Sequence, residues 1–147
     1  MKTLYSTISA RLASKTSLKF IDFDMGQLDA LEQGERPEVM YPCALLDIDY
    51  PNCDDETDTT QIVTARVSIR LGIEQHNPTD NLVTETRRNS GLAVFDTVAD
   101  VYKALQGYST TNFSSFSRKS VRPYRAFKGI KVVDIVFETT FEDTSAD

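Results

Sequence analysis

The chemistry open to this chain is limited by its residue types. His76 is the only histidine among 147 residues, so a mechanism that uses an imidazole as general base would need it. It stands beside Asn77 and Pro78, a pair typical of a loop, and spacing alone assigns it no nucleophile. The motifs of dinucleotide-binding and P-loop proteins, zinc proteases and serine hydrolases are absent from the sequence. We predict no catalytic residues and no enzymatic activity; a deep pocket holding His76 and two carboxylates would favour the alternative, a small-molecule enzyme.

The two cysteines, Cys43 and Cys53, lie ten positions apart. Together with His76 they supply too few ligands for a structural zinc site, which needs four. The sequence therefore predicts free thiols, no metal and no cofactor.

An acidic run supplies a second set of candidate metal ligands. Its members are Asp54, Asp55, Glu56 and Asp58. Carboxylates suit calcium, but the EF-hand pattern fails here, because its sixth position holds Thr59 instead of glycine and its twelfth holds Ala65 instead of glutamate. We interpret the run as a solvated hairpin loop.

Residues 113–125 interleave aromatic and basic side chains. The basic members are Arg118, Lys119, Arg122 and Arg125. Such a ribbon could stack nucleic-acid bases and contact phosphates. Phe113 and Phe116, however, are three positions apart and would lie on opposite faces of a regular strand. Three interpretations stay open: a site for single-stranded nucleic acid or another adaptor function, a contact with a protein partner or subunit, and a plain edge hairpin.

The charge of the chain is unevenly distributed. The net charge is −6, which disfavours nonspecific binding to nucleic acids and to anionic membranes. Residues 87–131 nevertheless carry nine basic and two acidic side chains, whereas the residues before them carry seven basic and fifteen acidic ones. Apolar stretches are only a few residues long, and the N-terminus lacks the apolar block of a signal peptide. We therefore expect a soluble intracellular protein.

Hydrophobic periodicity predicts the elements that position these groups. Leu4, Ile8 and Leu12 recur at four-residue spacing, which is typical of a short helix. The predicted strands are residues 43–50, 61–73, 113–125 and 130–142, and residues 18–24 are predicted to form a strand or an extended arm. The strand 61–73 is the clearest, because strict alternation of apolar and polar residues indicates one buried and one wet face.

A long helix is predicted for residues 81–105. Its apolar stripe, which would face the core, consists of Leu92, Phe95, Val98, Ala99, Tyr102 and Leu105. Gly107 then ends the helix. Residues 25–41 are predicted to be a connection with at most one helical turn, and residues 51–60 a polar loop.

This order of elements predicts one domain, residues 1–147, with an α+β fold. The expected architecture is a two-layer sandwich, in which two helices cover one face of a mainly antiparallel sheet of about four strands.

The same order resembles the tail-terminator, or tail-completion, proteins of long-tailed bacteriophages and prophages, a class of minor tail proteins. The residues that carry the resemblance are the proline-led strand MYPCALL at 40–46, the alternating strand 63–73 and the helix that ends VADVYKALQG at 98–107. The resemblance spans residues 1–143. The connection 25–41 and the acidic loop 51–60 depart from it.

The resemblance implies a structural virion protein without catalytic residues. Its copies would form a ring, expected to be a hexamer, at the head-proximal end of the tail tube. The ring would stop tube polymerisation and join the tail to the head. The implied partners are therefore further copies of the chain, the tail tube protein and the head-tail connector protein, with no membrane and with nucleic acid disfavoured. The implied location is the host cytoplasm during assembly and then the virion tail.

A head-to-tail ring needs two complementary surfaces on each copy. The charge asymmetry supplies them within one chain. We therefore predict that four basic residues of one subunit face four acidic residues of the next. The basic set is Arg118, Lys119, Arg122 and Arg125, and the acidic set is Asp54, Asp55, Glu56 and Asp58.

Overall fold

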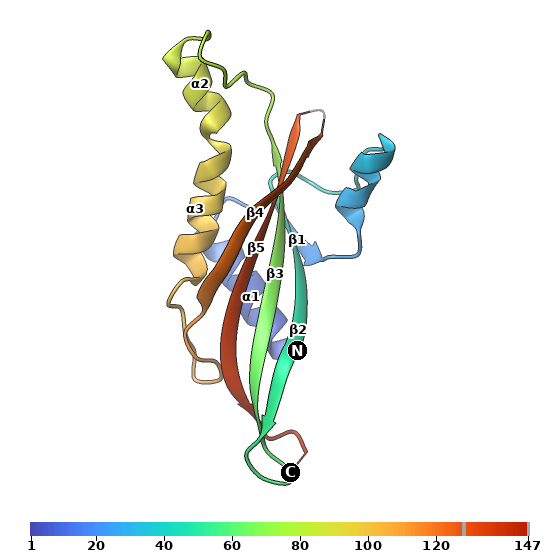
Figure 1. Cartoon of the computed structure of the whole chain (residues 1–147), viewed down its shortest axis with the longest axis vertical. Helices are drawn as coiled ribbons and strands as arrows, with labels where there is room; N and C mark the ends of the chain where they lie inside the picture. Colours follow the sequence, from blue (N-terminus) through green and yellow to red (C-terminus); the bar gives the residue numbers. More distant parts are fainter. Residues whose placement is uncertain (128, 147) are drawn as a thin grey trace.

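The protein folds as a twisted five-stranded sheet with helices packed against it (Figure 1). The structure is a computed structural model and describes residues 1–127 and 129–146. In chain order the elements are α1 (Lys2–Lys15), β1 (Phe20–Phe23), the 3-10 helix η1 (Gln27–Gln33), β2 (Cys43–Asp55), β3 (Gln61–Glu74), α2 (Glu85–Leu92), α3 (Val94–Leu105), β4 (Ser117–Phe127) and β5 (Ile130–Asp143). The predicted α+β class is confirmed.

The sheet has five strands where about four were expected. The strand order is β1-β2-β3-β5-β4, so β1 and β4 are its two edges. β1 pairs with β2 in parallel, and the other neighbours are antiparallel. The fifth strand is β1, which the sequence indicated only weakly because it is four residues long.

The larger core lies between one face of the sheet and the helices α1 and α3. Leu4, Ile8 and Leu12 of α1 are fully buried there, as their spacing predicted. Alternate residues of β3 point into this core while their neighbours remain partly exposed, so the period-two prediction for that strand is confirmed.

A second, smaller core lies on the opposite face of the sheet. It joins Leu28 of η1 to Cys43 and Leu45 of β2 and to Val132 of β5. The prediction that helices cover only one face is therefore wrong at this end of the sheet. Coverage on both faces explains why residues 43–46 are all buried instead of alternating.

The helix predicted for residues 81–105 is divided into α2 and α3, with Ala93 between them. The expected core stripe is also wrong in part. Of its members, Leu105 is buried, whereas Phe95 is 55% exposed and Tyr102 is 37% exposed. The face that packs on the sheet is instead the one with Val94 and Val101.

Two predicted loop and strand boundaries also change. β2 continues through Pro51 to Asp55, and a register shift against β3 between Asp49 and Asn52 accommodates the proline. β4 begins only at Ser117, because residues 113–116 form an irregular segment instead of a strand. Among the described residues, no helix combines the length and the apolar character needed to span a bilayer.

Candidate functional site

The basic residues predicted to form a contact surface all lie on β4. This strand pairs with β5 on one side and has an open edge on the other. Arg118, Lys119, Arg122 and Arg125 are exposed, and the strand contains no acidic residue. Pro123 lacks a backbone N–H and is tolerated on an edge strand, where it also discourages pairing with another strand.

Three of these four basic residues have partners within the chain. The guanidinium of Arg118 lies 4.0 Å from the centre of the Tyr102 ring. Lys119 Nζ lies 3.8 Å from Glu138 Oε2, and Arg125 Nη1 lies 4.0 Å from Glu32 Oε1. All three contacts are partly exposed, so each contributes little to the stability of the chain.

Arg122 is the exception among these basic residues. It is in register with Asp134 of β5, but Arg70 of β3 already binds that carboxylate at both oxygens, with distances of 2.8 and 3.2 Å. Within the part of the chain that the structure describes, Arg122 forms no ion pair. Its charge is therefore available to a partner.

Charges on the wet face of the sheet alternate across the strands. Arg66 of β3 lies 3.6 Å from Asp49 of β2 and 3.7 Å from Glu138 of β5, and Lys119 of β4 continues the row. Opposite charges in neighbouring strands stabilise the pairing by a few tenths of a kcal/mol, roughly, and leave this row neutral.

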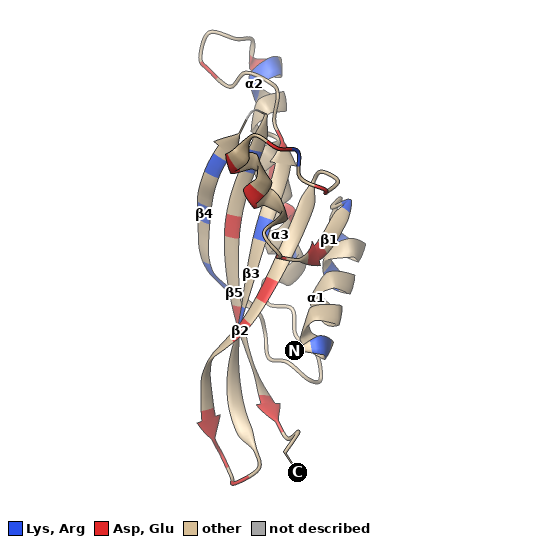
Figure 2. Cartoon of the chain, turned by 90° about the vertical axis from the view of Figure 1, so that its right-hand side faces the viewer, with Lys and Arg blue, Asp and Glu red and all other residues tan. Residues whose placement is uncertain are grey.

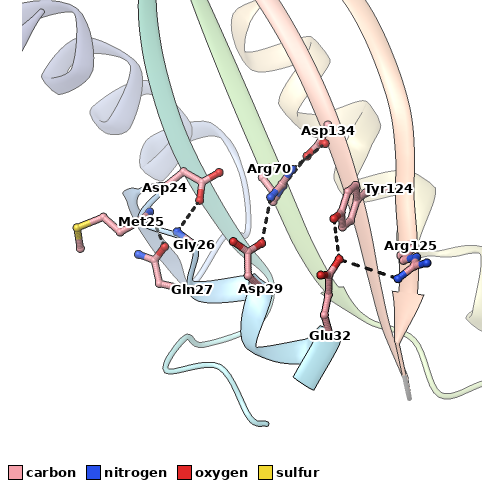
Figure 3. Close-up of polar contacts among 10 residues, drawn as sticks. All are labelled: Asp24, Met25, Gly26, Gln27, Asp29, Glu32, Arg70, Tyr124, Arg125 and Asp134. Atoms are coloured by element: carbon pink, nitrogen blue, oxygen red, sulfur yellow. Dashed lines mark hydrogen bonds and ion pairs between the residues drawn. The ribbon is translucent and has the colours of Figure 1, made fainter. Parts of the chain in front are cut away.

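A polar network ties η1 to this face of the sheet (Figure 3). Asp29 Oδ1 lies 3.5 Å from Arg70 Nη1, and Tyr124 donates a hydrogen bond of 2.8 Å to Glu32 Oε1. The hydrogen bonding that Arg70 donates to Asp134 is the main reason that the pKa of Arg70 is raised, and the hydrogen bond that Tyr124 donates to Glu32 raises the pKa of Tyr124. These contacts hold η1 across the strands. They also pair two carboxylates of η1, Asp29 and Glu32, with residues of the same chain.

The predicted acidic partners lie at the far end of the molecule (Figure 2). Asp54 and Asp55 belong to the end of β2, where they accept hydrogen bonds from Asn52 and Gln61 at 2.6 and 2.8 Å. Glu56 and Asp58 lie in the turn that follows, and all four side chains are exposed. Among the described residues, no ion pair joins this acidic set to the basic set on β4. Within one chain, the acidic set and the basic set therefore form no ion pairs with each other.

The aromatic part of the ribbon 113–125 is not available for stacking with bases. Phe113 is 6% exposed and Phe116 is 1% exposed, and both belong to the larger core. Tyr108 stacks on Phe116 at 6.2 Å between ring centres, while Phe113 meets Phe141 edge to face. The ribbon therefore presents basic groups with Tyr124 as its exposed aromatic ring.

His76 lines a hollow of about 650 Å³ between η1 and the ends of β3 and β5. Glu32, Glu35 and Glu74 also line it, over an apolar floor that includes Phe127. Glu32 accepts a hydrogen bond from Tyr124, and among the described residues no hydrogen bond joins His76 to these carboxylates. No group of three or more His, Cys, Asp or Glu side chains among the described residues could hold a metal ion.

Two exposed apolar patches were missed in the sequence. The helix patch is formed by Leu92, Phe95 and Tyr102, and the β1-edge patch by Phe23 and Met25. The sequence did contain a signal for the first patch, because apolar residues cover more of the circumference of residues 92–105 than one buried face requires.

A comparison of the sequence with protein-family models gives no match, and a comparison with curated proteins gives none either. The candidate functional features described above are surfaces: a basic edge strand, an acidic hairpin tip and two apolar patches.

Proposed function

We propose that this protein is a structural subunit whose copies close into a ring, and that it serves as a tail-terminator or tail-completion protein of a bacteriophage or prophage. In this role the ring, expected to be a hexamer, ends the tail tube and joins it to the head connector. The partners are other copies of the chain, the tail tube protein and the connector protein. The protein acts in the host cytoplasm during assembly and then in the virion tail.

The observation that carries this proposal is the unpaired charge on β4. Arg122 is exposed on an edge strand with four basic and no acidic residues, and its cross-strand carboxylate is already bound by Arg70. Acidic groups lie elsewhere on the same chain, at the hairpin tip and around η1. A head-to-tail contact joins two different surfaces of one kind of subunit, opposite charges favour such a contact, and a ring forms when the rotation between neighbouring subunits closes.

The hollow with His76 does not outweigh this argument. It brings an imidazole and carboxylates near one another, which is the feature that would favour an enzyme. Among the described residues, however, no hydrogen bond joins His76 to a carboxylate that could orient it as a general base. A structural role needs only the surfaces.

Light scattering after size-exclusion chromatography tests the proposal. The unaltered chain is expected to elute as one closed oligomer, and negative-stain images should show rings. A monomer at every concentration tested would contradict the proposal.

The Arg122→Glu variant tests the contribution of β4. It should weaken association by about 1 kcal/mol per contact, and more at low salt than at high salt, because salt screens exposed charges. Lys15→Glu is the matched control, since it makes the same change of charge at an exposed position at the end of α1. Equal oligomer sizes for the Arg122 variant and the control at low salt would show that β4 takes no part.

A further inference from the structure

The helix α3 is apolar on two faces, and only one of them has a partner within the chain. Val94, Val101 and Leu105 pack into the larger core. Phe95 and Tyr102 of the helix patch point to a different side of α3, because successive residues of a helix are rotated by about 100°. Leu92, the third member of the patch, is the last residue of α2 and is also exposed. Large apolar groups that gather on one exposed face indicate a contact with another molecule.

The β1-edge patch lies at the opposite edge of the sheet from β4, the strand beside the helix patch (Figure 1). Phe23 ends β1 and stacks on Tyr5 with ring centres 4.1 Å apart, yet it remains half exposed. Met25 is 75% exposed and points away from the polar network of η1 (Figure 3).

The charges beside the two patches are opposite. β4, which adjoins the helix patch through Arg118 and Tyr102, has four basic and no acidic residues. Residues 20–42, which include the β1-edge patch, have six acidic residues and one basic residue. Asp29 and Glu32 are paired within the chain, and the other four acids form no ion pair among the described residues. Figure 2 shows the basic positions of β4 and the acidic positions of β1 and η1 at similar levels along the molecule, whereas the acidic hairpin tip lies at one end.

We infer that the helix patch of one copy packs against the β1-edge patch of the next copy, with β4 facing the acidic segment 20–42. This inference rests on the proposed ring and specifies its contact. A second copy fits because both patches belong to this chain, lie near opposite edges of the sheet and have neighbouring segments of opposite charge. If the ring axis is parallel to the long axis of the subunit, surfaces of neighbouring copies that lie at the same height along that axis come into contact. Segment 20–42 thus replaces the hairpin tip as the partner of β4.

Cross-linking between two single-cysteine variants tests this contact. In a Cys53→Ser background, which removes the exposed thiol, Phe95→Cys and Met25→Cys are prepared separately and treated with a short bismaleimide. The mixture of the two variants should give a cross-linked dimer, and each variant alone should not, because the contact joins two different surfaces. A mixture of Phe95→Cys with Asp58→Cys is the control for the hairpin tip and should give no dimer.

The outcomes separate the contact from the ring itself. A ring in light scattering without the Phe95–Met25 product overturns this inference and leaves the proposed function standing. A dimer from Phe95→Cys alone overturns it as well, because the helix patch would then meet its own copy. A monomer under all conditions overturns the proposed function.

A second variant separates a loss of association from a loss of folding. Met25→Ser should weaken association at least tenfold, roughly, because an apolar side chain no longer becomes buried in the contact. Its midpoint of urea unfolding, measured on dissociated chains, should stay unchanged because Met25 is exposed. Unaltered association of Met25→Ser would contradict the inference.

Discussion

At the scale of single residues, the two cysteines have opposite environments. Cys43 is completely buried at the start of β2, and Cys53 is exposed near the end of the same strand. Burial raises the pKa of the Cys43 thiol from its ordinary value of 9.0 to about 11, because the thiolate would lose its hydration. The thiolate is the reactive form, so the two residues should differ strongly in reactivity.

We expect one thiol per chain to react rapidly with a disulfide reagent at pH 8. Cys53 should react, whereas Cys43 should react only after unfolding in urea. Counting the released chromophore in native and denatured protein measures both values, and Cys53→Ser should abolish the fast reaction. Two rapidly reacting thiols in the native protein would show that the end of β2 opens readily.

Arg70 is the central residue of the wet face. It binds Asp134 at two atoms, approaches Asp29 and lies over the ring of Tyr124 at 4.7 Å. Its side chain is only 23% exposed, so these contacts are less screened than those of the more exposed Arg66.

Arg70→Met should lower the free energy of unfolding by about 1–2 kcal/mol, because the half-buried Asp134 loses its charged partner. Arg66→Met is the matched control on the same strand and should cost about 0–1 kcal/mol. Urea unfolding monitored by circular dichroism measures the difference. Equal losses for the two variants would mean that the network around η1 adds no stability.

At the scale of elements, α3 has one buried and one exposed apolar face, and we expect the first to control stability and the second the proposed association. Its buried face holds the helix on the sheet, and its exposed face carries the helix patch. The same helix can therefore be altered on either side with different consequences.

Val101→Ala should destabilise the monomer by about 2 kcal/mol, since it removes methyl groups from a filled core. Phe95→Ser should change the free energy of unfolding by less than about 0.5 kcal/mol, because that ring is already exposed. Both values come from urea unfolding at a concentration where the chains are dissociated. A large loss of stability for Phe95→Ser would place its ring in the core.

At the scale of the whole molecule, one core connects most of the elements. Residues from α1, β2, β3, α3 and β5 all contribute to the larger cluster. The smaller cluster shares β2 and β5 with it, so the two cores cannot separate without breaking the sheet.

We therefore expect dissociated chains to unfold in a single transition. Circular dichroism, which follows the helices and strands, and tyrosine fluorescence, which follows side-chain packing, should give coincident urea curves. Ile8→Ala should shift both curves together by about 2–4 kcal/mol. Separate transitions for the two probes would show that η1 and its small core unfold on their own.

The sequence by itself determined the elements in which local pattern and burial agree. Leu4, Ile8 and Leu12 predicted α1, and strict alternation predicted β3 nearly to its ends, because helices and strands with one buried face impose periods of 3.6 and 2 on the sequence. The basic residues that now define the edge of β4 were also found from sequence.

Tertiary structure alone decided which faces are covered. In α3 the sequence offered two apolar faces of similar character, and only packing against the sheet selected the one with Val101. Likewise, Arg122 and Arg125 look alike in sequence. Their difference arises because Arg70, 52 positions before Arg122, occupies Asp134, while η1 folds over the sheet and brings Glu32 to Arg125. Such long-range competition for partners depends on three-dimensional proximity, which residue spacing does not contain.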